Sequence, residues 1–534
     1  MIRRFSTQQQ ICRSLLPLDA PGGSGPVLYA RDGQYWRDPG DHHFAVYGRT
    51  QKGKTTSFST TETLSVIRNG ECGIVMESKD CVFRATAHLA RESHDVYCVD
   101  LSSPHTSPDT YNPLDYIAHC AQSSDPQHQD WAREEIRELT LAMVPPDPQT
   151  PFWELSPNTL LAGIIQSLLE ITQDREEINL DSVCAMLSQG QRKVARSTIM
   201  KELAAFLPWG LARQNLECYT NAAEATAGSI FSIASSALSG LAASQGVMDL
   251  LCNNSLSVAT LDGTHRPFLI YVILSDLTQT YNTAAAILVG QLIRRLVRQA
   301  NSQGGVLTRR VSFILEELGM VGRAIPSLPQ LMSQCLGRGI RVSLILQSMS
   351  QLDQLFGAAG GAIIRDNVGV NVVFAQGDGN SLEMASRLCG TYTLQYGLQS
   401  ITRPVLESWA IGQMETGQAL VLAHGLRYVT RLPMYRDLPG WEPPPDQPLP
   451  RKPRRPHRCF QLEEYVLRLR REHMDRVLNA PSSPPDRGKL FLLPNDGPPP
   501  RERQVPLPED LDFLENYFKN KEKKRRDTPK EEPV

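Results

Sequence analysis

The chain has 534 residues, of which 41% are hydrophobic and 21% are charged, and its formal net charge is −2 at pH 7. This length exceeds what a single hydrophobic core supports and predicts two or three domains. The near-neutral charge excludes a protein coated in basic residues, so any nucleic-acid contact must come from a local patch or an assembled channel.

The eleven cysteines form neither a C-x-x-C pair nor a His/Cys cluster at metal-ligand spacing. We therefore expect reduced thiols and a cytoplasmic protein. No apolar run approaches the roughly 18 residues of a membrane span, and no apolar stretch follows Met1-Ile2-Arg3-Arg4 as a secretory signal requires. Any place at the inner face of the cell membrane would then be peripheral and would depend on a partner.

The first hundred residues predict one half of a parallel sheet. Residues 1–26 are expected to form an arm that ends in a Pro- and Gly-rich turn. Apolar runs at residues 43–47, 73–77 and 96–100 then alternate with helix-length segments. This β-α-β-α order over residues 27–112 is typical of a parallel sheet covered on both faces.

A phosphate-binding loop follows the first of these strands. Residues 48–55 complete the pattern G-x-x-x-x-G-K-[ST], and residues 56–66 can form a helix. Backbone N–H groups of such a loop surround a β-phosphate, Lys54 reaches the β/γ oxygens and the Thr55 hydroxyl reaches Mg²⁺. The predicted ATP-binding residues are Gly48, Arg49, Thr50, Gln51, Lys52, Gly53, Lys54, Thr55 and Thr56.

The organisation then changes twice along the chain. Residues 113–255 carry helical patterns and predict an all-helical domain, with helices near 131–144, 158–172, 180–187, 194–206 and 222–243. Residues 256–440 return to the α/β pattern, with strands at 268–274, 311–315, 342–346, 370–374 and 419–423. Residues 441–534 predict a mostly disordered Pro-rich charged tail with a helix at 462–478 and a short amphipathic piece at 511–518.

Two acids end the predicted strand at residues 311–315. A phosphate loop needs a carboxylate for the Mg²⁺ shell and a base for the attacking water. We expect Glu316 to support the metal with Thr55, and Glu317 to polarise the water. Gln347, at the end of the strand at 342–346, is a candidate sensor of the γ-phosphate.

The order of motifs after the acids resembles the type IV coupling proteins, the hexameric ATPases of conjugation and type IV secretion. The resemblance covers roughly residues 40–435. It rests on these stretches: Tyr111-Asn112-Pro113-Leu114-Asp115, Ser275-Asp276-Leu277, Gly319-Met320-Val321-Gly322-Arg323-Ala324-Ile325-Pro326, Gly337-Arg338-Gly339-Ile340-Arg341-Val342, Gln347-Ser348-x-x-Gln351-Leu352 and Phe356-Gly357. Two features depart from the family. Glu316-Glu317 stands where Asp-Glu is usual, and N-terminal membrane helices are not expected.

The resemblance implies a RecA-like P-loop motor with an inserted all-helical domain. It further implies a homo-hexamer that binds ATP between subunits, acts on DNA or a relaxase-type nucleoprotein, and meets components of a type IV secretion channel. An arginine from a neighbouring subunit would approach the γ-phosphate, and the candidates are Arg338, Arg341, Arg365 and Arg387.

Nucleic-acid contact has weaker support. Arg294, Arg295 and Arg298 predict a basic helix face, and Arg309-Arg310 and residues 451–458 are further basic groups. Such groups are more often solvated faces or linkers than binding surfaces. Two alternatives to a coupling protein remain: a hexameric translocase for chromosome segregation or DNA packaging, and a non-motor adaptor for protein effectors that nucleotide switches.

Overall fold

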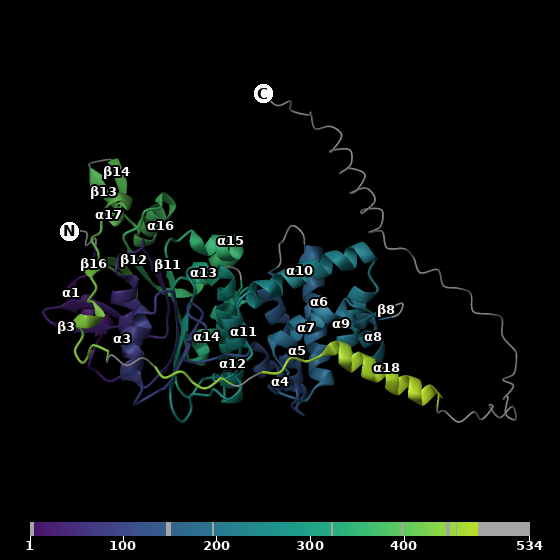
Figure 1. The fold of residues 1–534 in the computed structure, drawn as a ribbon. Coiled ribbons are helices and arrows are strands. Elements are labelled where there is room, and N and C mark those ends of the chain that lie inside the picture. Colours follow the sequence, from purple (N-terminus) through teal and green to yellow (C-terminus); the bar gives the residue numbers. More distant parts are fainter. Residues whose placement is uncertain are drawn as a thin grey trace, which may run out of the picture. The chain divides into compact units, whose positions relative to one another are not determined.

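The computed structural model describes residues 5–145, 151–194, 197–321, 324–396, 399–444, 449–454 and 457–478. Its largest sheet has nine strands in the order β16-β15-β12-β4-β11-β10-β5-β9-β6. Figure 1 labels β11, β12 and β16 among them. The strands are β4 (His43–Tyr47), β5 (Cys72–Glu77), β6 (Asp95–Asp100), β9 (Phe268–Ile273), β10 (Val311–Leu315), β11 (Ile340–Leu346), β12 (Val368–Phe374), β15 (Gln418–Ala423) and β16 (Leu426–Arg431). All pairs are parallel except those that add β15 and β16 at one edge.

The central strands are apolar throughout because both faces of the sheet are covered. In β4, Phe44 and Val46 face one hydrophobic core, whereas Ala45 and Tyr47 face the other. This two-residue alternation is the ordinary consequence of strand geometry. The first core includes residues of α1 (Gln8–Ser14) and α3 (Cys81–Ala90), and the second includes residues of α12 (Asn282–Ser302) and α14 (Leu328–Cys335).

The described residues between 113 and 251 form mainly helices and add no strand to the nine-stranded sheet. The helices are α4 (Pro113–Ala121), α5 (Pro126–Met143), α6 (Pro151–Ile171), α7 (Leu180–Gly190), α8 (Ile199–Phe206), α9 (Leu211–Thr220), α10 (Glu224–Ala242) and α11 (Gln245–Leu251). Helices α4, α9 and α11 were not predicted. The helix expected from residue 194 starts later, because the short ribbon of β7 (Lys193–Val194) and β8 (Ser197–Thr198) precedes α8.

Among the described residues, the helical group and the sheet share one hydrophobic core. One hydrophobic core runs from β10 and β11 through α12 into α5, α6 and α7, and residues up to His473 form one compact unit. The domain limits near residues 112 and 256 therefore stay predictions, since packing alone does not draw them.

Helix α10 bears on the expectation that no apolar run is long enough to span a membrane. Over the part of the chain that the structure describes, it is the one helix long and apolar enough to do so by length and composition. Its hydropathy comes from Ala, Ser and Gly as well as large apolar residues, so no unbroken apolar run reveals it. Four of its residues pack into the core: Ile230, Ala234, Leu238 and Leu241.

The N-terminal segment differs from the expected arm. The Thr7 side chain and Gln10 form a capping box that begins α1, and Ile11 and Leu15 are buried against the sheet. The following strand β1 (Leu16–Pro17) pairs with β3 (Gln34–Arg37), which also pairs with β2 (Val27–Arg31). Residues 5–26 are thus part of the globular fold.

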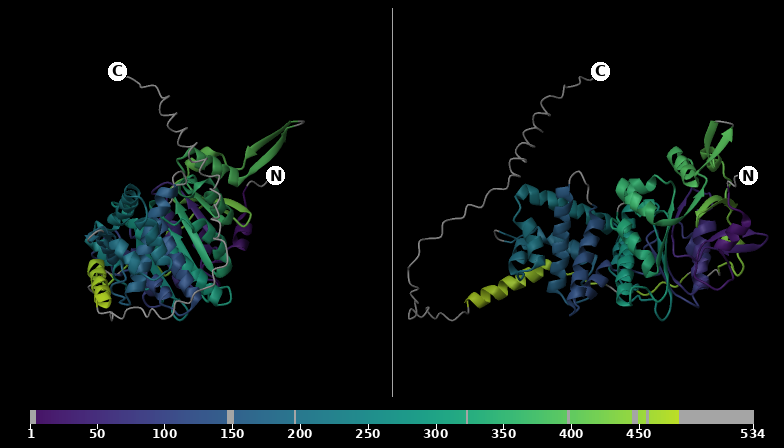
Figure 2. Two further views of the ribbon diagram at one scale, coloured as in Figure 1. Left: turned by 90° about the vertical axis from the view of Figure 1, so that its right-hand side faces the viewer. Right: turned by 180° about the vertical axis from the view of Figure 1, so that it is seen from behind.

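The remaining elements between residues 318 and 412 lie outside the nine-stranded sheet. The elements are α13 (Leu318–Val321), α15 (Gln351–Asn367), α16 (Gly379–Cys389) and α17 (Ser408–Gly412), with a ribbon of β13 (Thr391–Tyr396) and β14 (Gln399–Pro404). This ribbon projects from the body of the molecule (Figure 2). Strand β16 and the ribbon were missed from the sequence, because neither is an apolar run.

A C-terminal strap, residues 449–454 and 457–473, corrects the start of the predicted tail. Lys452 Nζ lies 2.7 Å from Asp109 Oδ1, and Phe460, Leu462 and Val466 are buried in the core that contains the helices. The strap ends within α18 (Leu462–Leu478), which matches the predicted helix. The amphipathic piece expected at 511–518 lies outside the described residues.

Candidate nucleotide-binding site

The phosphate loop lies at the carboxyl end of β4 and leads directly into a helix. Residues 55–59 form one π-helical turn, and α2 (Thr60–Arg68) continues from it. The loop requires unusual backbone angles, since Gln51 and Gly53 have φ values of 63° and 102°. Glycine adopts such angles without strain, which explains the second glycine of the motif.

Lys54 folds back over this loop. Its ammonium group donates to the carbonyl oxygen of Gly48 and to that of Arg49, the latter at 3.2 Å. The side chain is largely buried, and this burial lowers the pKa of the Lys54 amine although Glu317 and Glu316 oppose the shift. The cation is therefore held at the mouth of the loop, where an anion could replace the carbonyl contacts.

The phosphate loop and Glu316 are in contact, as the sequence predicted. Strand β10 lies between β11 and β5, so Glu316 emerges beside the phosphate-loop helix. Thr55 Oγ1 donates to Glu316 Oε2 at 3.1 Å, and Ser59 Oγ donates to Glu316 Oε1. Burial raises the pKa of Glu316 to about 7 against the opposing effect of these two hydrogen bonds.

Glu317 lies on the solvent side of the same site. Its φ is 51°, an angle that a non-glycine residue seldom adopts and that is frequent at functional sites. Gln347, at the end of β11, donates from Nε2 to Glu317 Oε2 at 3.0 Å. The candidate base and the candidate sensor are thus side by side on neighbouring strands.

These groups surround an open pocket of about 270 Å³. Of the predicted residues, Gly48 and Gln347 do not line it directly. They are connected to it through Lys54 and Glu317 respectively. The lining residues are Arg49, Thr50, Gln51, Lys52, Gly53, Lys54, Thr55, Thr56, Glu77, Ser78, Lys79, Cys81, Glu316, Glu317 and Thr416.

Glu77 is the pocket carboxyl that sequence reasoning missed. It ends β5 and is almost fully buried, and its two oxygens accept the backbone N–H groups of Val82 at 2.8 Å and Phe83 at 2.7 Å. Burial, with a further contribution from Glu316, raises its pKa to about 8. The sequence did contain a signal for Glu77. It is a charged residue at the end of an apolar strand, and that strand lies beside the one that carries Glu316.

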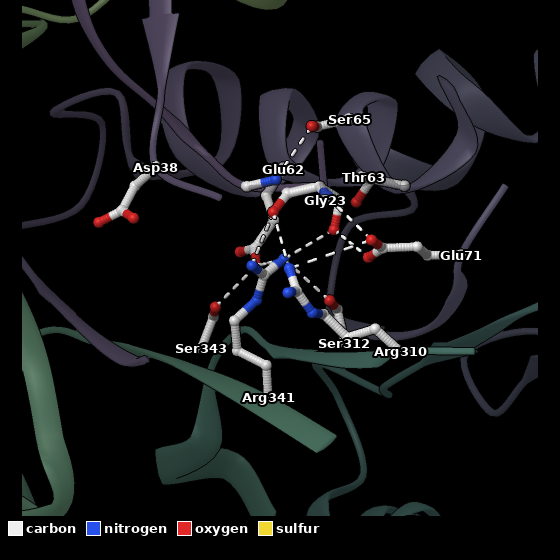
Figure 3. A network of polar contacts seen from close by, with 12 residues as sticks. Gly23, Asp38, Glu62, Thr63, Ser65, Glu71, Arg310, Ser312, Arg341 and Ser343 are labelled. Atoms are coloured by element: carbon white, nitrogen blue, oxygen red, sulfur yellow. Dashed lines mark hydrogen bonds and ion pairs between the residues drawn. The ribbon is translucent and has the colours of Figure 1, made fainter. Parts of the chain in front are cut away.

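One candidate for an arginine acting between subunits is withdrawn. Arg341 is fully buried beneath α2, where its Nη2 lies 3.4 Å from Glu62 Oε1 (Figure 3). Its Nη1 donates to the Ser24 carbonyl at 2.8 Å. Ser343 Oγ also donates to Glu62 Oε1, at 3.0 Å. A guanidinium enclosed in this way cannot reach a neighbouring chain, whereas Arg387 is largely exposed.

The predicted basic helix face is also an internal feature. Arg294 and Arg298 of α12 are mostly buried, and each forms an ion pair with Glu135 of α5 at 2.7 Å. Arg310 is engaged likewise, because its Nη2 lies 2.8 Å from Asp41 Oδ1. These arginines connect elements of the fold and do not form a nucleic-acid surface.

Comparison with known proteins identifies the family. The profile of the family described as type IV secretory system conjugative DNA transfer matches residues 5–429. The chain belongs to this family. It is therefore a coupling protein of conjugative DNA transfer, as the motif order predicted. None of the curated proteins is significantly similar to it in sequence.

Solved structures agree on the fold. The plasmid coupling protein TrwB in complex with the non-hydrolysable GTP analogue GDPNP matches with a TM-score of 0.62 and 14% identity over 84% of this chain and 96% of that chain. TrwB in complex with ADP and Mg²⁺ matches with a TM-score of 0.60 and 13% identity over 81% and 93% of the two chains. This chain thus has the predicted α/β P-loop NTPase fold with a mostly parallel central sheet.

Proposed function

We propose that this coupling protein hydrolyses ATP to drive DNA, or a DNA–protein complex, into a type IV secretion channel. The observation that carries the proposal is the contact between Thr55 of the phosphate loop and Glu316, residues 261 positions apart in the chain. A P-loop NTPase needs this juxtaposition of phosphate loop and acid-bearing strand. The TrwB structures with nucleotide support the same use of the fold.

The oxygen donors of the site fit Mg²⁺. Thr55 Oγ1 and the Glu316 carboxylate are hard ligands within hydrogen-bonding distance of each other, and Mg²⁺ prefers such oxygens together with substrate phosphates. Bound Mg²⁺ would neutralise charge that develops on the phosphates. Glutamate in place of the family's usual aspartate is one methylene longer, and Ser59 fixes the position of its other oxygen.

Glu317 and Gln347 are assigned to the attacking water. The carboxylate orients a water and accepts its proton, and the amide of Gln347 holds that carboxylate from the neighbouring strand. Lys54 supplies positive charge to the β/γ oxygens, and the backbone of residues 48–56 surrounds the phosphates. Gln347, through this contact, is positioned to respond to the γ-phosphate.

Partners and location follow as part of the proposal. We assign DNA and a relaxase-type nucleoprotein as substrates, channel components as docking partners, and a homo-hexamer as the active form. The protein would work in the cytoplasm at the inner face of the membrane, which it would reach through a partner. Arg338, Arg365 and Arg387 remain candidates to complete a neighbour's site.

The decisive experiment compares ATP turnover of the wild type with that of Lys54→Ala, with and without single- and double-stranded DNA. Lys54→Ala should lose turnover by at least a hundredfold with an unchanged circular dichroism spectrum, because a preorganised charge at the phosphates is lost. Wild-type turnover in Lys54→Ala would refute the site. Wild-type turnover that DNA leaves unchanged would instead favour the nucleotide-switched adaptor.

Glu317→Gln separates binding from chemistry. The amide keeps the shape of the side chain but cannot accept a proton, so we expect ATP affinity within a few-fold of the wild type and turnover reduced by about 10²–10⁴-fold. Fluorescent-nucleotide titration and steady-state turnover measure the two quantities. Unchanged turnover would reassign the base, and Glu77 would be the next carboxyl to test.

A further inference from the structure

Outside the nucleotide pocket, the fold brings together a carboxylate and two imidazoles that are distant in the sequence. Asp38 and His42 lie in the connection from β3 to β4, and His424 lies in the turn between β15 and β16. One potential ligand atom of each lies within 4.8 Å of the other two. Because β15 runs antiparallel to β12, this cluster lies at the end of the sheet opposite the phosphate loop.

Asp38 is the buried member of the cluster. Its side chain is 1% exposed, its Oδ1 accepts the Gly40 N–H at 3.0 Å, and its Oδ2 lies 2.8 Å from His424 Nε2. One oxygen is thus fixed by the backbone while the other faces an imidazole. The hydrogen bond from His424 and that from Gly40 lower the pKa of Asp38 against the effect of burial. A buried anion of this kind needs a cationic partner.

The turn that carries His424 does not itself require a histidine. His424 and Gly425 have φ values of 53° and 73° and connect the paired residues Ala423 and Leu426. Two consecutive positive φ values define a type I′ hairpin turn, in which Asn, Asp or Gly normally takes the first position. The imidazole is therefore explained by its contact with Asp38 and not by the turn.

The position of His42 depends on two glycines. Its ring lies 4.8 Å from the His424 ring, centroid to centroid. A Cβ added to Gly40 would lie 2.3 Å from His42 Nε2, and one added to Gly369 would lie 3.1 Å from His42 Nδ1. Larger residues at these two positions would displace the His42 ring.

We propose that Asp38, His42 and His424 bind a divalent transition-metal ion of the Zn²⁺ type. Two imidazole nitrogens and one carboxylate oxygen are an ordinary donor set for such ions, and water would complete the shell because both histidines are accessible. The ion would fasten the turn of the β15–β16 hairpin to the segment that begins β4. The ion pair between Asp38 and His424 holds the site together when no metal is bound.

The test uses the full chain, stripped with EDTA and titrated with Co²⁺. We expect one Co²⁺ per chain with the visible absorption of a four- or five-coordinate ion, displaced by Zn²⁺, and a higher thermal midpoint in Zn²⁺. Both effects should disappear in His424→Asn, which suits the type I′ turn, and in His42→Asn. His265→Asn, at an exposed histidine elsewhere, should keep both effects.

The Mg²⁺ ligands of the nucleotide pocket do not confuse this result, because an all-oxygen site gives Co²⁺ only weak octahedral bands. Absorption that survives both His424→Asn and His42→Asn would overturn the proposal. A wild type that shows no such bands at millimolar Co²⁺ would overturn it as well. Neither outcome bears on ATP turnover, so the proposed function is tested separately.

Discussion

Two buried carboxyl groups, Glu77 and Glu316, give the nucleotide pocket an unusual electrostatic character. Burial raises their pKa values to about 8 and about 7, so both hold protons for much of the time near neutral pH in the nucleotide-free protein. The pocket then carries less negative charge than its three acids would suggest. A triphosphate can approach it at a smaller electrostatic cost.

This feature predicts a pH dependence of stability. Folded Glu77 retains a proton that the unfolded chain releases above its ordinary pKa, so the free energy of unfolding should fall as pH rises from about 4.5 to about 8. One such group changes the free energy of unfolding by up to about 1.4 kcal/mol per pH unit within this window. Urea unfolding at pH 6, 7 and 8 gives the free energy of unfolding at each pH. Its fall with rising pH should be shallower for Glu77→Gln than for the wild type. Glu383→Gln, at a largely exposed site, should keep the wild-type slope, and equal slopes for all three proteins would contradict the prediction.

At the scale of elements, charged residues hold helices together in this protein. The ion pairs of Arg294 and Arg298 with Glu135 connect α12, which covers the sheet, to α5 of the helical group. The strap makes a second connection, because Lys452 contacts Asp109 after β6 while Leu462 is buried with the helices. Both connections run between segments that the sequence assigned to separate domains.

Arg298→Leu tests the first connection. The variant removes one of the two guanidinium groups paired with the buried Glu135, while Arg294 stays in contact, so we expect a loss of about 1.5–3 kcal/mol in the free energy of unfolding. The salt dependence of DNA binding should stay as in the wild type, since this guanidinium is enclosed. Arg387→Leu, at an exposed position, should change stability by less than about 0.5 kcal/mol. A normal stability with a shallower salt slope would restore Arg298 as a DNA contact.

Leu462→Ala tests the strap. Truncating a fully buried leucine costs about 2–5 kcal/mol, whereas a disordered tail would tolerate the change. Met474→Ala, at an exposed position on the same helix, is the matched control and should be nearly neutral. Thermal unfolding gives the midpoint of each variant. Equal midpoints for Leu462→Ala and Met474→Ala would show that the segment behaves as the predicted disordered tail.

At the scale of the whole molecule, the proposed ring predicts dependence between chains. Lys54→Ala subunits should retain the surfaces for assembly and lack turnover. When equal amounts of wild-type and Lys54→Ala chains are mixed under conditions that allow exchange, DNA-dependent turnover should fall below half of the wild-type rate. Turnover equal to the fraction of wild-type chains at every mixing ratio tested would show that subunits work alone. The same mixture assembled from wild-type chains only is the control.

The sequence predicted most of this architecture for identifiable reasons. Buried parallel strands are apolar throughout, so the strands that carry Thr55 and Glu316 to one edge stood out, and the phosphate loop has a fixed spacing. Glu77 and the Asp38–His424 contact were hidden, because periodicity gives the faces of an element and not which loops meet. Arg341 misled for a different reason: a charge was taken to be exposed, while its partner Glu62 lay on a helix nearly 280 positions away.

The buried pair of Glu62 and Arg341 has a mechanical consequence. It connects α2, which follows the phosphate loop, to β11, which ends just before Gln347, through groups that water does not reach (Figure 3). We therefore expect these two elements to move together during the proposed turnover. Under the proposed function, any relative motion that ATP turnover causes would then arise outside the block formed by α2 and β11.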